Sequence, residues 1–100
     1  MTNYSRGAYY ERKTKKTLED EGYVSLRTAG SHGAFDIIAF NGSIVRFIQC
    51  KATRNKNPTV KSYKEELNII KDIIVPECVT KELWIYSTND RGKVIKVCVL

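Results

Sequence analysis

The sequence predicts a single α/β domain with a central mixed β-sheet flanked by helices, in the order αβββαββ. One segment of helical character precedes three short strand-like runs, and a second lies between these and two more. This alternation is typical of an α/β layer design. The chain has 100 residues, of which 42% are hydrophobic. That is enough for one small core, so we expect one domain over residues 1–100.

The first predicted element is a helix over residues 4–21. This segment is rich in Arg, Lys and Glu, has few β-branched residues, and is followed by Gly22. Residues 23–28 then alternate apolar and polar side chains. This alternation indicates a half-buried strand with Val24 and Leu26 on its apolar face.

An Asn41-Gly42 pair predicts a two-residue hairpin turn between strands at residues 35–40 and 43–53. With that turn, Asp36 lies opposite Phe47. Residues opposite each other, or two positions further along, share one face of a sheet. We therefore expect one face to carry Asp36, Val45, Phe47, Gln49 and Lys51.

A second helix is predicted to begin at Ser62, because Glu65 follows three residues later in a capping-box pattern. Pro76 marks its end. Residues 82–87 and 93–100 are expected to form a closing strand pair around residues 89–92. The apolar stripe of the helix comprises Tyr63, Leu67, Ile70 and Ile74.

The positive charge is concentrated around a single acid. The net charge is +6, and from Gly22 to Lys64 the chain has seven Lys and Arg but one acidic residue, Asp36. A basic stretch around one carboxylate suits a polyanion held near an acid or metal site. Nucleic acid is the leading partner, with an acidic protein or an anionic membrane as weaker alternatives.

Three widely spaced cysteines, Cys50, Cys78 and Cys98, predict reduced and mostly buried thiols rather than disulfides or a zinc site. No apolar run approaches the roughly 18–20 residues of a membrane span, and the first residues do not resemble a signal peptide. We expect a cytoplasmic protein that does not enter a membrane.

The shared face suggests a phosphodiesterase site. Mg²⁺ prefers oxygen ligands, which the Asp36 carboxylate and the Gln49 amide supply, and Mn²⁺ is expected to substitute. The Cys50 carbonyl and Glu11 are candidates to complete the shell, and Lys51 can hold the attacking water or balance transition-state charge. Glu11 is expected to point inward from the helix, where an ion pair with a helix lysine or Lys51 is the alternative role.

These residues resemble the PD-(D/E)xK nuclease superfamily, most closely its archaeal Holliday junction resolvase branch. The resemblance runs from Arg6 to Thr53 and includes Arg6–Arg12, Leu26–Ser31, Phe35–Ala39 and Gln49–Lys51. It implies a restriction-endonuclease-like fold and a metal site at Glu11, Asp36, Gln49 and Lys51. It also implies roles in phosphate handling and cleavage for Arg12, Arg27 and Ser31, with Ser31 among the catalytic residues.

Two departures from the resolvases stand out. Gln49 replaces an acid, a Gln-x-Lys form that Mrr-like nucleases also use, and it is expected to weaken metal binding. The second half of the chain is unlike the resolvases, which dimerise through later elements.

Further DNA contacts are expected outside the metal site. The loop after residue 53 carries basic residues that no acid interrupts, and His32 is expected to contact phosphate or solvent rather than to act as a base. The full set of expected DNA contacts is Arg6, Arg12, Lys13, Arg27, His32, Arg54, Lys56 and Lys61.

The leading hypothesis is a homodimeric, Mg²⁺-dependent endonuclease that resolves four-way DNA junctions. The alternatives are a non-catalytic DNA-binding module on the same fold, a Mrr-like duplex nuclease, and an RNA nuclease.

Overall fold

A computed structural model describes residues 3–28, 33–89 and 93–99, with residues 3–6 described by their backbone alone. The predicted order αβββαββ and the α/β class are confirmed. The elements are α1 (Asn3–Asp20), β1 (Val24–Arg27), β2 (Ile37–Phe40), β3 (Val45–Thr53), the 3₁₀ turn η1 (Val60–Tyr63), α2 (Lys64–Asp72), β4 (Val79–Ser87) and β5 (Val94–Val99).

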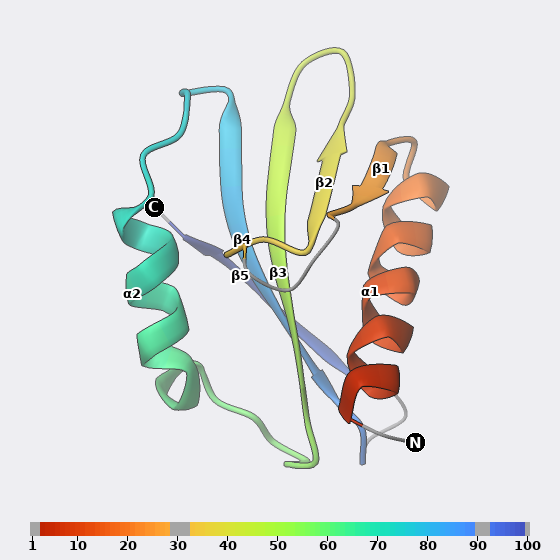
Figure 1. Ribbon diagram of the computed structural model, residues 1–100, viewed down its shortest axis with the longest axis vertical. Helices are drawn as coiled ribbons and strands as arrows, with labels where there is room; N and C mark the ends of the chain where they lie inside the picture. The colour runs from red at the N-terminus through yellow and green to blue at the C-terminus, as the bar shows by residue number, and fades with distance from the viewer. Residues whose placement is uncertain (1–2, 29–32, 90–92, 100) are drawn as a thin grey trace.

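The strands form one sheet in the order β1-β2-β3-β4-β5 (Figure 1). Only β3 and β4 pair in parallel, and α2 lies in the connection between them. Parallel neighbours need such a crossover, because a short turn cannot return the chain to the same end of the sheet. The predicted mixed sheet is therefore confirmed.

The two helices cover opposite faces of the sheet, and β4 is buried on both. Leu18 of α1 packs in one cluster with Trp84 and Tyr86, whereas Ile70 of α2 packs in another with Leu83. Consecutive strand residues point to opposite faces, so the two clusters lie on the two sides of the sheet. Trp84 and Tyr86 thus fill the core beneath α1.

The turn between β2 and β3 is longer than predicted. Phe40 pairs with Val45, leaving residues 41–44 as the loop. The Asn41 side-chain oxygen accepts hydrogen bonds from the backbone N–H groups of Ser43 and Ile44, at 2.8 and 2.9 Å. This side-chain cap replaces the tight turn. The longer loop shifts the pairing of β3 with β2 by two residues from the predicted register. A shift of two keeps each β3 side chain on its predicted face.

The apolar face of β1 is not the buried one. Val24 and Leu26 are each 53% exposed, whereas Ser25 is 4% exposed. Ser25 lies on the side covered by α1. The opposite side stays open over β1, because α2 packs on β4 and β5 at the other end of the sheet (Figure 1).

The predicted capping box of the second helix is wrong. Ser62 lies in η1, its hydroxyl is 3.4 Å from Thr59 Oγ1, and α2 begins only at Lys64 without a side-chain cap. The helix ends at Asp72, so Ile74 lies past it and is 98% exposed. The other three residues of the predicted stripe do pack toward the sheet.

The prediction that the cysteines are mostly buried is also wrong. Cys78 precedes β4 in a turn and Cys98 lies on the edge strand β5, and both are exposed, whereas Cys50 is half-buried. All three are free thiols. Neither α1 nor α2, the helices of the described residues, is long and apolar enough to cross a membrane.

We predict that Leu26→Ala costs less than about 1 kcal/mol of unfolding free energy, whereas Leu83→Ala costs about 2–5 kcal/mol. Leu83 is fully buried and its truncation leaves a cavity, whereas half of Leu26 is already in contact with solvent. Urea denaturation of both variants measures the difference. Equal losses would contradict the described burial of β1.

Candidate metal-binding site

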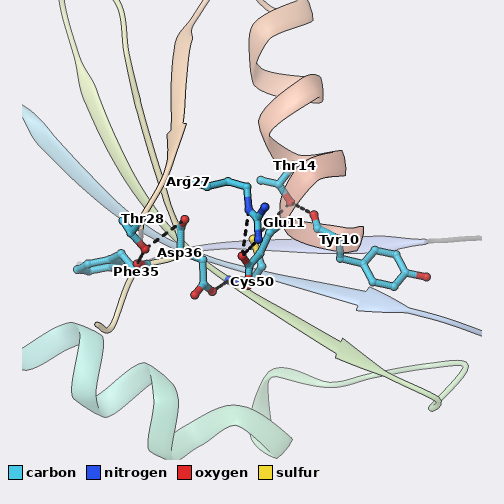
Figure 2. Close-up of polar contacts among 8 residues, drawn as sticks. All are labelled: Tyr10, Glu11, Thr14, Arg27, Thr28, Phe35, Asp36 and Cys50. Carbon is cyan, nitrogen blue, oxygen red and sulfur yellow. Dashed lines mark hydrogen bonds and ion pairs between the residues drawn. The ribbon is translucent and has the colours of Figure 1, made fainter. Parts of the chain in front are cut away.

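Asp36 lies at a bend directly before β2, and its carboxylate reaches across to β3. Its Oδ2 atom accepts a hydrogen bond from the backbone N–H of Cys50 at 2.8 Å (Figure 2). The β2–β3 ladder ends at the pair Ile37–Ile48, so Cys50 lies beyond it, on an edge of β3 that β2 leaves unpaired. The N–H and C=O of one strand residue point to the same side, so the Cys50 carbonyl faces this edge too.

The backbone around Asp36 is held from both sides. Its N–H donates to the carbonyl of Ile48 at 2.8 Å, and its carbonyl accepts from the N–H of Thr28 at 2.9 Å. The Thr28 hydroxyl donates to the Phe35 carbonyl at 2.8 Å (Figure 2). Sequence reasoning missed Thr28; the available signal was a threonine at a strand end, where hydroxyls often bind nearby backbone.

Gln49 and Lys51 share a face, as predicted. Gln49 aligns with Leu83 in the parallel pair, and Leu83 belongs to the cluster on the α2 side. Phe47 pairs with Ile38 instead of Asp36. The Asp36 N–H donates to the carbonyl of Ile48, the residue before Gln49. The Oε1 atom of Gln49 is buried and has no hydrogen-bond partner among the described residues. A buried acceptor without a donor is costly, and a cation would satisfy it.

Glu11 points from α1 toward the same end of β2. Its Oε1 atom accepts hydrogen bonds from Arg27 Nη2 and Nε, at 3.0 and 3.3 Å (Figure 2). The side chains of Glu11 and Arg27 remain 24% and 35% exposed. An ion pair was an expected alternative for Glu11, but its partner is Arg27 and not Lys51 or a lysine of the helix.

The electrostatics of Asp36 show that these groups act on one another. Burial raises the pKa of the Asp36 carboxyl above its ordinary value, and the nearby Glu11 raises it further. The Cys50 amide, Lys51 and Arg27 oppose this by favouring the charged form. The structure therefore brings both predicted carboxylates, the predicted lysine and the predicted arginine into one site.

The thiol of Cys50 is turned to α1, where it donates to the Thr14 hydroxyl at 3.3 Å. Mg²⁺ and similar hard ions take oxygen rather than sulfur ligands. The predicted contribution of Cys50 is consequently limited to its carbonyl oxygen.

The donor set of this site suits a hard cation. Glu11 and Asp36 offer carboxylate oxygens, Gln49 an amide oxygen, and Cys50 a carbonyl oxygen, which are the groups that Mg²⁺ and similar ions accept. Within residues 3–28, 33–89 and 93–99, no three His, Cys, Asp or Glu side chains are grouped for a metal ion. An ion at this site would therefore rely on the Gln49 amide and the Cys50 carbonyl besides the two carboxylates.

The predicted DNA contacts differ in their surroundings. Arg12 is exposed, whereas Lys13 lies over the rings of Tyr10 and Tyr86, 5.9 and 5.7 Å from their centroids. The segment after β3 is tied to the end of β4, because Ser87 Oγ donates to the Asn55 carbonyl at 2.7 Å. Its exposed basic residues are Arg54, Lys56 and Lys61.

Three predicted contacts are not among the side chains that the structure describes. Ser31 and His32 lie outside the described residues, and Arg6 is described by its backbone alone. Their roles stay predictions.

Comparison with known proteins supports the resemblance found in the sequence. The family model of the archaeal Holliday junction resolvase (Hjc) matches residues 2–75. The crossover junction endodeoxyribonuclease Hjc of Methanocaldococcus jannaschii is 40% identical over 50 residues, which cover 50% of this chain and 37% of that protein. The match thus covers little more than a third of that relative's length.

We predict that Asp36→Asn makes the metal-free protein more stable than the wild type at pH 7. The folded-state pKa of Asp36 is raised, so its contribution to stability is full below the ordinary Asp pKa of about 3.9 and is lost as pH rises through the folded value. The neutral amide avoids this loss. Denaturation midpoints at several pH values should show a gap that closes as pH falls below about 4.

The control is Asp72→Asn, which removes a carboxylate outside the site, at the end of α2. A gap between wild type and Asp36→Asn that stays constant with pH would contradict the burial of Asp36.

Proposed function

The chain belongs to the archaeal Holliday junction resolvase family, and we propose that it is a metal-dependent endodeoxyribonuclease that cuts the backbone of four-way DNA junctions. The observation that carries this proposal is the Asp36 carboxylate at the open edge of β3, which accepts a hydrogen bond from the Cys50 amide and feels the charges of Glu11 and Lys51. The restriction-endonuclease-like fold supports it, since α1, the bend before β2, and β3 supply these residues.

We further propose Mg²⁺ as the ion, with Mn²⁺ as a substitute. Asp36, Gln49, the Cys50 carbonyl and Glu11 are the groups that would hold it. When bound, such an ion activates water and neutralises charge at a phosphate. The unpartnered Gln49 Oε1 and the raised pKa of Asp36 both support this, because a cation would satisfy the first and favour the charged form of the second.

The side chains around the ion would then handle the phosphate. Lys51, for which the described residues include no ion pair, is free to hold the attacking water or to balance charge developing on the phosphate. Arg27 stands beside the site and Arg12 is exposed on α1, so both can contact phosphate oxygens. The basic residues after β3 would hold the DNA backbone beyond the cut.

A homodimer fits this task, because resolving a junction needs two symmetric nicks. We propose the outer side of η1 and α2 as the dimer contact. Val60 in η1, Ile69 in α2 and Ile74 just past α2 are 42%, 60% and 98% exposed, and a dimer contact would cover such apolar side chains.

The direct test uses a labelled four-way junction and the corresponding duplex, each with Mg²⁺ or Mn²⁺. We expect the wild type to cut the junction in preference to the duplex. Asp36→Ala and Lys51→Ala should each reduce cutting by at least about 100-fold, because each removes a group that acts on the reacting phosphate. Cutting that survives both substitutions would contradict the assignment.

Gln49→Glu is the informative companion variant. It restores the acid at this position, so Mn²⁺ binding measured by calorimetry should tighten by about 10-fold. Salt-sensitive DNA binding without metal binding or cutting, in the wild type and in Gln49→Glu, would instead identify a non-catalytic DNA-binding module.

For the dimer, we predict that Ile69→Lys lowers the mass measured by sedimentation from dimer to monomer. A lysine cannot be desolvated at an apolar contact without a partner. The variant should nick a junction once instead of cutting it symmetrically.

Val24→Lys is the matched control, because Val24 is similarly exposed at the other end of the sheet. A dimer that survives Ile69→Lys and is lost with Val24→Lys would place the contact on the open face of β1.

A further inference from the structure

The hydroxyl of Thr14 lies at the centre of a buried polar cluster between α1 and the sheet. Thr14 is fully buried, and its hydroxyl donates to the carbonyl of Tyr10 at 2.8 Å (Figure 2). The same oxygen lies 2.7 Å from the Tyr86 hydroxyl, and it accepts from the Cys50 thiol at 3.3 Å. Because the Thr14 proton is used on a carbonyl, Tyr86 must be the donor in its pair.

Each partner of Thr14 belongs to a different part of the fold. Tyr10 precedes it by one turn of α1, Cys50 lies on β3 and Tyr86 on β4. A hydroxyl has one proton and two acceptor positions, so these three contacts use its full capacity. Burial raises the pKa of the Tyr86 phenol and of the Cys50 thiol to about 12, so both remain donors at neutral pH.

The cluster is bonded to Asp36 and lies one helical turn from Glu11. Glu11 lies three residues before Thr14, on a neighbouring part of the helix surface. Cys50 uses its thiol on Thr14 and its backbone N–H on Asp36. The polar path from Thr14 to the Asp36 carboxylate therefore passes through Cys50 (Figure 2).

Apolar packing alone would not fix this geometry. Leu18 and Tyr10 hold α1 on the sheet by burial, and the hydrophobic effect has no direction. A helix held only in that way can shift along its axis by a fraction of a turn, which would move Glu11 relative to Asp36. Hydrogen bonds to two strands resist such a shift.

We propose that Thr14 is a positioning residue, which fixes Glu11 relative to Asp36 through its hydrogen bonds to Cys50 and Tyr86. The inference rests on the proposed function, since it concerns how the metal ligands of that site are held. Mg²⁺ needs near-ideal octahedral geometry, so a small displacement of one ligand should weaken binding.

The test is Thr14→Val, which keeps the size and branching of the side chain but removes the hydroxyl. Mn²⁺ binding to the whole chain, measured by calorimetry without DNA, should weaken by about 10-fold. Junction cutting should lose more activity with Mg²⁺ than with Mn²⁺. Thr14→Ser, which restores the hydroxyl, should recover binding to within about 3-fold of the wild type.

Thr17→Val is the matched control. Thr17 makes the same bond to the helix backbone, with its hydroxyl donating to the Lys13 carbonyl at 2.9 Å. Among the described residues, Thr17 makes no hydrogen bond to the sheet, so its substitution should leave Mn²⁺ affinity unchanged. Tyr86→Phe provides a second route if Thr14→Val does not fold, and it should weaken Mn²⁺ binding as well.

The outcomes separate this inference from the proposed function. Wild-type Mn²⁺ binding that neither Thr14→Val nor Tyr86→Phe weakens would overturn the positioning role and leave the proposed function standing. A wild type that binds no Mn²⁺ and cuts no junction would overturn both.

Discussion

The hydrogen bond from the Cys50 amide to the Asp36 carboxylate is the contact on which the candidate site depends. It forms because β2 is only four residues long while β3 runs for nine. Past the end of β2, the backbone of β3 would otherwise lack a partner on that side. The Asp36 carboxylate accepts the Cys50 N–H that a longer β2 would have paired. This hydrogen bond holds the carboxylate beside β3.

The open edge also explains how groups from both faces of the sheet meet. Glu11 comes from the helix on one side, and Gln49 and Lys51 lie on the other. A complete ladder would separate them. Where the ladder stops, Glu11, Lys51 and Arg27 all lie close enough to act on the charge of Asp36. The half-buried Asp36 carboxyl with its raised pKa and the unpartnered Gln49 amide oxygen would both be stabilised by a cation.

Much of this arrangement could be predicted from the sequence, because it depends on patterns of period two. The turn after β2 has four residues instead of two, yet the error is an even number, so Phe47, Gln49 and Lys51 keep their predicted face. The fold class and the element order follow from the helix and strand periodicities of the sequence. The direction of Glu11 follows from its position on the same helix face as Leu18.

The rest depends on contacts between distant residues, which local patterns do not encode. No residue near Val24 in the sequence indicates that α2 leaves this face of β1 uncovered. The exposure of Val24 was therefore not predicted. Ser62 has the spacing of a helix cap, but its hydroxyl lies beside Thr59. The pairing of Glu11 with Arg27 joins residues 16 positions apart in the sequence, and arises only when α1 docks beside β1.

The central claim is that the open edge of β3 is a cation site, and anomalous X-ray scattering from crystals soaked in Mn²⁺ tests it most directly. We expect one strong peak next to the Asp36 carboxylate, within reach of the Gln49 amide oxygen and the Cys50 carbonyl. A peak elsewhere, or an Asp36 site that stays without manganese at millimolar concentrations, would contradict it.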